Sequence, residues 1–152
     1  MTAETKAYGT VEVDECQRIR IPAGLYGFEG MEEYLLMDAE QHPFYWLQSL
    51  DMKDIAFVLI NPMLIRPGYD PCLDPMDFEL LGLQGPDDEN LLMFTIVTIP
   101  EDRDKMTVNL QGPLIINRES REGRQCISLD ESLKVRHNIL DEIASASATV
   151  SC

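Results

Sequence analysis

The sequence is poor in the residues that most often carry catalysis or bind metals. Among its 152 residues are two histidines and four cysteines. Neither histidine belongs to an HExxH pattern and no cysteines form a CxxC pair, so the spacings typical of zinc sites and thioredoxin-like sites are absent. There is also no GxSxG motif, in which a nucleophilic serine stands on a sharp turn. We therefore expect no enzyme activity, no catalytic or metal-binding residues and no cofactor.

Long apolar segments are also missing. No stretch approaches the roughly 20 apolar residues that a membrane-spanning helix needs, and residues 1–6 lack the apolar region of a secretory signal. We therefore expect a cytoplasmic protein that does not enter the membrane. In that reducing compartment the four cysteines are most simply free thiols: Cys16, Cys72, Cys126 and Cys152.

Positive charge is missing from the middle of the chain. Residues 67–102 contain nine acidic residues and no Lys or Arg, and the whole chain carries a net charge of −15. The small basic run at 118–124 is interrupted by glutamates. Direct binding of nucleic acid is not expected, because phosphate neutralisation needs clustered Lys and Arg. An acidic surface of this kind either attracts a basic protein or maintains solubility.

The apolar residues that are present follow mainly a β pattern. Residues 94–117 contain three strand-like runs separated by Pro100 and by Gly112 with Pro113, which predicts a β-meander at the centre of the protein. Further strands are predicted at 8–13, 17–21, 44–49, 56–60 and 125–129, and residues 32–37 are predicted as a strand or as a short helical turn leading into one. The first two of these could pair as a hairpin. Four aromatic residues of the strands are expected to contribute to the core: Phe44, Trp46, Phe57 and Phe94.

Two helices interrupt the β pattern. Asp74 is a favourable N-cap, Pro75 suits the first helical position and Gly82 suits a stop, so a short helix is predicted at 75–81. Apolar residues near helical spacing predict a C-terminal helix at 132–146.

Several segments resemble the flagellar assembly factor FliW. The glycine-rich loop at 22–29, Pro-Ala-Gly-Leu-Tyr-Gly-Phe-Glu, is similar to the P-x-G-L-x-G-F loop of that family, and its glycine spacing fits no nucleotide-binding fingerprint. The resemblance runs from about Tyr8 to His137, and residues 133–137 depart from the family pattern. The other similar segments, in the family's order, are 43–51, 56–57, 69–71, 97–101 and 106–117.

This resemblance implies an all-β, barrel-like domain with the short helix as an insertion. With the C-terminal helix predicted from the apolar spacing, we expect a single, mainly antiparallel β domain at 1–144. The small polar residues at 145–152 are expected to form a flexible tail. The resemblance also implies a function. FliW proteins bind flagellin, and when flagellin is exported they bind the translational repressor CsrA and relieve its repression of flagellin translation. The family has no enzyme activity and no cofactor.

The expected partners are therefore flagellin and CsrA, and the protein itself is expected to be a monomer. An acidic surface suits a basic RNA-binding regulator, and the eight methionines offer adaptable apolar surface for the amphipathic helical ends of flagellin, although methionine also fills ordinary cores. Two alternatives stay open: a flagellin chaperone without a regulatory arm, and an unrelated acidic β-barrel scaffold. The residues predicted to contact a partner are Tyr69, Asp70, Asp74, Asp77, Lys105, Met106 and Asn109.

Overall fold

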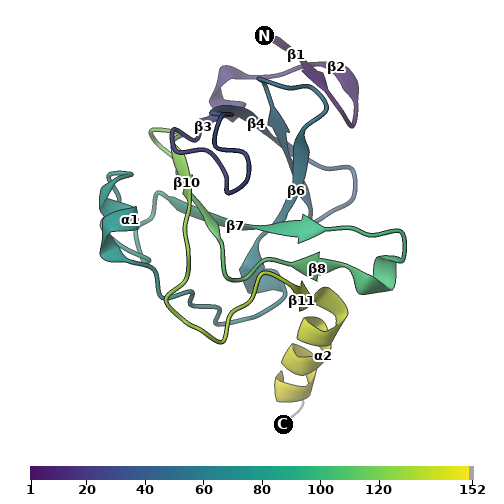
Figure 1. Cartoon of the computed structure of the whole chain (residues 1–152), viewed down its shortest axis with the longest axis vertical. Coiled ribbons are helices and arrows are strands. Elements are labelled where there is room, and N and C mark those ends of the chain that lie inside the picture. Colours follow the sequence, from purple (N-terminus) through teal and green to yellow (C-terminus); the bar gives the residue numbers. More distant parts are fainter. Residues whose placement is uncertain (151–152) are drawn as a thin grey trace.

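Figure 1 shows the computed structural model of the chain; the structure describes residues 1–150, with side chains through residue 146. The regular structure is mainly antiparallel strand, which confirms the predicted all-β class. The strands are β1 (Thr2–Thr5), β2 (Gly9–Glu12), β3 (Arg18–Arg20), β4 (Glu33–Asp38), β5 (Tyr45–Ser49), β6 (Ala56–Ile60), β7 (Leu91–Thr98), β8 (Thr107–Val108), β9 (Leu114–Asn117), β10 (Gly123–Gln125) and β11 (His137–Asn138). The helical segments are α1 (Pro75–Glu79), α2 (Ile139–Val150) and the 3₁₀ turns η1 (Glu15–Gln17), η2 (Pro62–Leu64) and η3 (Arg103–Lys105).

The main sheet closes on itself as a barrel. Its strands follow the order β10-β9-β7-β6-β5-β4-β3, and neighbouring strands are antiparallel. The two ends of this order meet where Arg20 of β3 lies beside Glu122, next to β10, and the Arg20 N–H donates to the Arg121 carbonyl at 3.0 Å. Closure leaves an interior that side chains must fill. The β1–β2 hairpin and α2 lie at opposite ends of the molecule (Figure 1).

The main core lies inside the barrel. It includes Ile21, Leu25, Tyr34, Leu47, Leu59, Leu114 and Ile116, each at most 1% exposed. Successive side chains of a strand point to opposite faces, so Leu47 contacts this core whereas Trp46 packs in a second cluster with Leu35 and Met37. The predicted core aromatics are confirmed: Phe94 is buried, and the three others are half-buried against the clusters.

The predicted β-meander is wrong in its strand pairing. β8 and β9 do not pair with each other, because both pair with β7, β8 near its carboxyl end and β9 near its amino end. They are two parts of one interrupted strand. The Asn109 N–H still donates to the Ile96 carbonyl of β7 at 2.9 Å, and residues 110–113 are looped out before β9 begins. Within this loop Pro113 has no N–H for a ladder, and the Gly112 N–H bonds to the Asn109 side chain at 2.9 Å. The predicted burial of β9 is confirmed.

The predicted hairpin between 8–13 and 17–21 is also wrong. The first of these segments, observed as β2, pairs with β1, and the second, observed as β3, pairs with β4. η1 separates them. In this turn the Asp14 N–H donates to Gln17 Oε1 at 2.9 Å, and the Gln17 N–H donates to the Asp14 carbonyl at 3.0 Å. These local bonds redirect the chain before the two segments can pair.

The last predicted strand, 125–129, is displaced toward the N-terminus. β10 ends at Gln125, although the Cys126 N–H still donates to the Pro113 carbonyl at 2.8 Å. Pro113 cannot return a bond, and it belongs to the looped segment 110–113, so the ladder ends there.

Helix α1 confirms the predicted start and stop signals. The Asp74 side chain accepts the Met76 N–H at 2.9 Å, as an N-cap does. After the helix Gly82 adopts a φ of +70°, and the Leu83 N–H donates to the Phe78 carbonyl at 2.9 Å. This closing turn favours glycine, because a side chain is strained at positive φ. The helix itself is shorter than predicted, ending at Glu79.

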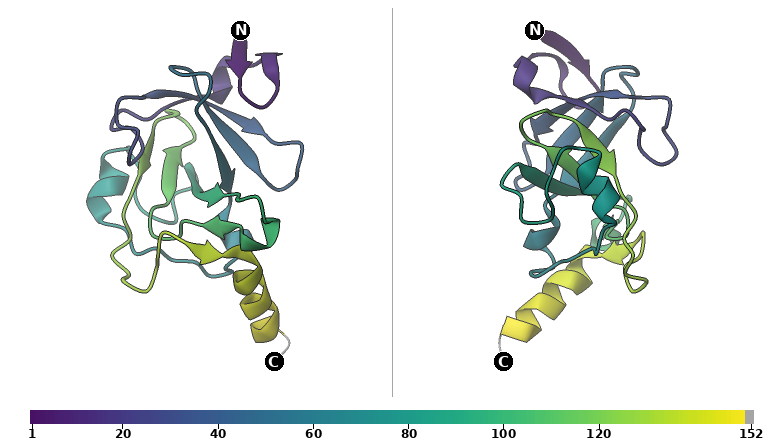
Figure 2. Two further views of the ribbon diagram at one scale, coloured as in Figure 1. Left: turned by 45° about the vertical axis from the view of Figure 1, so that its right-hand side comes forward. Right: turned by 90° about the vertical axis from the view of Figure 1, so that its left-hand side faces the viewer.

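Helix α2 begins later than predicted for the C-terminal helix. The two residues before it form β11 against β8, and Asn138 then caps the helix by accepting the Asp141 N–H at 3.0 Å. The pairing with β8 is long-range and overrides the helical spacing of the preceding residues. α2 extends away from the barrel (Figure 2) and overlaps the predicted tail at 145–152. The flexibility of that tail stays a prediction, and 151–152 lie outside the described residues.

A cluster of charged side chains holds the first turn of α2 on the barrel. Arg66 donates to the Glu142 carboxylate from Nε at 2.9 Å and from Nη2 at 2.5 Å. His137 Nδ1 lies 3.2 Å from the same carboxylate, and its Nε2 accepts the Lys134 N–H at 2.7 Å. The imidazole is neutral in this arrangement, because a protonated Nε2 cannot accept. Burial and the Arg66 charge lower the pKa of His137, and the hydrogen bonds from Arg66 lower the pKa of Glu142.

We expect the free energy of unfolding to decrease as the pH falls below neutrality. His137 binds a proton less readily in the folded state, so unfolding takes up a proton and becomes easier as the pH falls through the ordinary histidine pKa, about 6.5. Glu142 adds to the slope only at the lower pH where carboxylates bind protons. Urea unfolding at a series of pH values measures this slope. His137→Gln should flatten it, whereas His42→Gln, at an exposed turn, should not. A slope that is unchanged in His137→Gln would contradict this origin.

Candidate functional site

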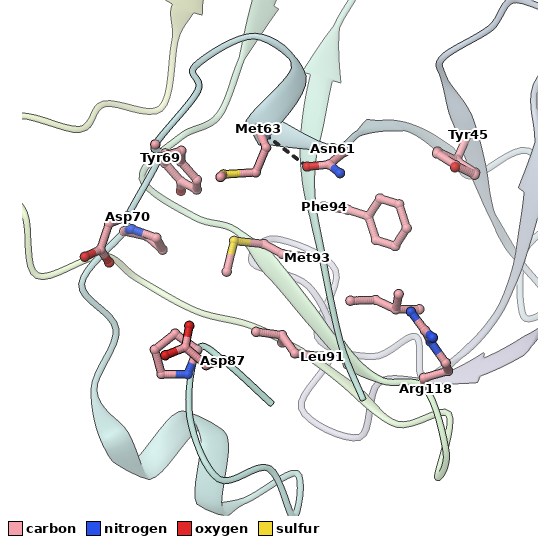
Figure 3. A pocket seen from close by; sticks show the side chains of 14 residues that line it. Tyr45, Asn61, Met63, Tyr69, Asp70, Asp87, Leu91, Met93, Phe94 and Arg118 are labelled. Atoms are coloured by element: carbon pink, nitrogen blue, oxygen red, sulfur yellow. Dashed lines mark hydrogen bonds between the residues drawn. The ribbon is translucent and has the colours of Figure 1, made fainter. Parts of the chain in front are cut away.

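An open cleft of about 790 Å³ lies on the barrel wall beside β7 (Figure 3). One side is formed by the segment 61–71, which follows β6, and the other by residues around 86–94, which lead into β7. Tyr45 and Phe94 close one end of it, with their rings 5.2 Å apart in an edge-to-face arrangement. This end of the cleft is therefore formed by residues of the barrel strands β5 and β7.

Two methionines form the apolar centre of the cleft. Met63 stands in η2, a turn that begins where the Asn61 side chain accepts the Met63 N–H at 3.0 Å. This turn leaves Met63 48% exposed at the mouth. Met93 projects from β7 toward the same space with Leu91 beside it, and both are half-buried (Figure 3). Flexible thioether side chains adapt to apolar groups of different shape.

The edge formed by Tyr69 and Asp70 is fixed to the barrel. Tyr69 is 7% exposed, and its hydroxyl donates to the Leu110 carbonyl. Burial raises the pKa of Tyr69, which keeps this hydroxyl protonated. The next residue, Asp70, accepts the Cys72 N–H at 3.0 Å through Oδ1. Tyr69 therefore positions Asp70 at the cleft and offers little surface of its own to a partner.

Charges of both signs stand at the rim of the cleft. Asp70 and Asp87 are exposed on one side, and Arg118 is exposed on the other (Figure 3). The Arg118 N–H donates to the Asn90 carbonyl at 2.8 Å, which fixes its backbone beside the cleft. Among the residues whose side chains the structure describes, no carboxylate forms an ion pair with the Arg118 guanidinium. This guanidinium is free to meet an anionic group of a partner.

An acidic face, formed by α1 and the segment 84–90, lies next to the cleft. Both parts line one smaller pocket, which places them side by side. Asp74, Glu79 and Glu89 are exposed on this face. Asp88 accepts two backbone N–H groups at 2.9 Å each, and these bonds lower its pKa. The face remains negatively charged at neutral pH, as the composition of the segment predicts.

Asp77 does not belong to this exposed face. It is 9% exposed, and its Oδ1 accepts from Arg124 Nε at 2.9 Å. The pair joins α1 to β10 next to the buried thiol of Cys126, whose pKa burial raises to about 12. Asp77 therefore docks α1 on the barrel, and its predicted contact with a partner stays a prediction. Cys16, Cys72 and Cys126 are free thiols, and Cys152 lies outside the described residues.

The remaining predicted contacts lie away from the cleft. Lys105 and Met106 are at the turn between β7 and β8, on the side of the molecule opposite α1 (Figure 1). Lys105 is exposed, whereas Met106 is half-buried and its carbonyl accepts the Ile139 N–H at 3.0 Å. Asn109 lines a separate groove of about 350 Å³. The structure thus brings Tyr69 and Asp70 together at the cleft and leaves these three residues apart from it.

Among the cleft residues that the sequence did not identify as a site, four provide its two central methionines and two of its rim charges: Met63, Asp87, Met93 and Arg118. The sequence could have indicated Asp87, because this residue lies in the acidic stretch 67–102, which has no Lys or Arg. The Asn-Pro pair before Met63 indicates a turn. Met93 and Arg118 carry no local signal, since the pairing of β7 with β9 determines where they lie.

The cleft can offer apolar contact and charge pairing. No group of three or more His, Cys, Asp or Glu side chains in the described part of the chain is placed to hold a metal ion. Over the same residues, no helix has the length and apolar character needed to cross a membrane. Apolar contact with charged groups at the rim is the chemistry by which proteins recognise segments of other proteins.

The fold and the cleft define a small closed β-barrel protein with an open surface cleft beside an acidic face. The profile of a family described as "FliW protein" matches residues 2–139. The flagellar assembly factor FliW of Treponema denticola is 41% identical over 96% of this chain and 98% of its own length, and that of Leptospira biflexa is 41% identical over 97% of each. A crystal structure of the flagellar assembly factor FliW superposes with a TM-score of 0.82 at 31% identity, covering 91% of this chain and 96% of that one. The chain belongs to the FliW family.

Proposed function

We propose that this protein acts in flagellar assembly as a cytoplasmic, monomeric regulator that binds flagellin and antagonises the translational repressor CsrA. Flagellin level would thereby control flagellin translation. Family membership supports the role in flagellar assembly. The observation that supports two partners is the presence, side by side, of a methionine-centred cleft and an adjoining acidic face. The proposal includes no catalytic step and no cofactor.

The cleft is proposed as the flagellin site. An amphipathic helix binds by laying its apolar face in a groove, and the exposed Met63 with the half-buried Met93 and Leu91 provides such a surface. Exposed apolar surface continues at Leu64, which is 57% exposed. Contiguous exposed apolar groups on a folded domain commonly mark a site of protein contact.

The acidic face is proposed as the CsrA site. CsrA binds RNA, and RNA-binding proteins carry clustered basic residues. The exposed carboxylates Asp74, Glu79 and Glu89 would attract such a partner and accelerate encounter. Asp77, which is paired with Arg124, adds little to this field.

We expect the combined change Asp74→Asn, Glu79→Gln and Glu89→Gln to lower the association rate with CsrA about fivefold at low salt, in the range typical of rim charges that steer encounter. The difference should shrink at high salt, because the Debye length falls from about 10 Å at 0.1 M to about 3 Å at 1 M. Asp74→Asn retains a competent helix cap, so loss of fold is not the expected cause. Surface-plasmon kinetics at two salt concentrations measures both rates.

A matched control removes the same number of negative charges near the β1–β2 hairpin, away from α1 (Figure 1). The control variant carries Glu4→Gln, Glu40→Gln and Asp54→Asn, at three exposed positions near the hairpin. This triple change should lower the CsrA association rate much less than the change on the acidic face. Flagellin binding should be similar in both triple variants. Equal, salt-insensitive CsrA association rates for wild type and both variants would leave the acidity as a solubility feature only.

A further inference from the structure

The rim charges of the cleft are segregated, and this segregation has a direction. Asp70 and Asp87 stand on one side of Met93, and Arg118 stands on the other (Figure 3). All three charged side chains are exposed, and the Arg118 guanidinium forms no ion pair among the described side chains. A symmetric apolar groove would accept a helix in either direction, whereas this one distinguishes the two ends of its occupant.

An α-helix carries partial positive charge at its amino end and partial negative charge at its carboxyl end. Its exposed N–H groups favour carboxylates, and its last carbonyls favour a guanidinium. In natural helices, acidic side chains are often found near the amino end, where they would oppose carboxylates of the rim. The dipole and the free backbone groups therefore determine the direction most strongly where the helix ends within the cleft.

We propose that the cleft binds an amphipathic helix in one direction, with the amino end at Asp70 and Asp87, the apolar face on Met63 and Met93, and the carboxyl end at Arg118. The occupant is a terminal helix of flagellin, so this inference rests on the proposed function. Charge complementarity between the rim and the two helix ends sets the direction, and the apolar centre of the cleft fits the amphipathic helical end that the proposed function assigns to flagellin. Hydrogen bonds hold Asp70 and the Arg118 backbone in place. The two helix ends are therefore distinguished by the positions of these groups as well as by their charges.

Photo-crosslinking from two positions tests the direction. Cys72 is an exposed thiol beside Asp70, and with Cys16→Ser and Cys152→Ser it becomes the reactive cysteine, because Cys126 is 1% exposed. A second probe is placed at the Arg118 side by Ser120→Cys, at an exposed position, with Cys72→Ser. Each protein is labelled with a thiol-reactive photo-crosslinker, mixed with flagellin and irradiated, and the captured flagellin residues are mapped by mass spectrometry.

The expected result is that flagellin residues captured from Cys72 precede, along the flagellin chain and within one helix, those captured from the Ser120→Cys position. The reverse order, or both orders equally, overturns the inference while flagellin binding itself stands. If wild-type protein does not bind flagellin at all, the proposed function fails and the inference fails with it.

Affinity provides the second readout. Arg118→Glu should weaken flagellin binding about tenfold in fluorescence titrations at low salt, because it places a carboxylate at the carboxyl end of the helix. The matched variant Arg118→Lys keeps the charge and should bind within about twofold of wild type. Equal affinity for all three proteins removes Arg118 from the site and overturns the directional assignment.

Discussion

Replacing Gly24 with alanine is expected to destabilise the fold by about 4 kcal/mol, the sum of strain at positive φ and overpacking. Gly24 adopts a φ of +71°, and a Cβ there would lie 2.5 Å from the Glu29 Cα and 2.7 Å from the Glu29 carbonyl oxygen. These are backbone atoms, so no side chain can rotate away. The loop cannot shift easily either, because Leu25 is 1% exposed in the barrel core and the Tyr26 N–H donates to Gln125 of β10 at 2.9 Å.

The same loop supplies the controls for this prediction. Gly27 also has positive φ, +89°, but a Cβ there meets nothing within 4 Å, so Gly27→Ala should cost only about 1 kcal/mol. Gly30 is open and not at positive φ, and Gly30→Ala should change stability by less than about 0.5 kcal/mol. Urea unfolding of the three variants measures the series. An equal decrease in the free energy of unfolding for all three variants would show that the close contact between Gly24 and Glu29 does not exclude a side chain at position 24.

Trp46→Ala is expected to destabilise the fold by about 3 kcal/mol, the lower end of the range for truncating a packed aromatic residue. Trp46 is half-buried on the outer face of β5, where it packs with Leu35 and Met37. Its Nε1 donates to the Tyr8 hydroxyl at 3.1 Å, so it also holds the segment between β1 and β2. The lower end applies because part of the ring is already in contact with water.

Two variants separate the packing of Trp46 from its hydrogen bond. Trp46→Phe retains most of the apolar contact, and Tyr8→Phe removes the hydroxyl, so each should cost about 1 kcal/mol. Equilibrium unfolding measures all three variants, and the fluorescence maximum of wild-type Trp46 should lie to the blue of free indole. A loss below about 1 kcal/mol for Trp46→Ala would mean that the cluster under the β1–β2 hairpin contributes little to stability.

The elements that could be predicted from the sequence are those specified by neighbouring residues. The cap, the first turn and the stop of α1 all lie between Asp74 and Gly82, and the structure reproduces them. The apolar run at 56–60 likewise predicted a strand, and the structure has it as β6, between β5 and β7.

The elements that could not be predicted depend on contacts between distant residues. β8 and β9 share β7 because residues 110–113 are looped out between them, and α2 starts late because β11 pairs with β8. Asp77 looked like an exposed carboxylate because its partner, Arg124, is 47 residues away. The cleft combines Met63, Met93 and Arg118, and no local pattern brings residues from three parts of a barrel together.

The central claim is that this protein connects flagellin level to flagellin translation, and a reconstituted translation reaction tests it most directly. Translation of a flagellin messenger is first repressed with CsrA, and this protein is then added with and without excess flagellin. The account predicts that the protein restores translation and that flagellin abolishes the restoration. Binding of flagellin without any relief of repression would contradict the regulatory arm and leave a flagellin chaperone as the function of this barrel.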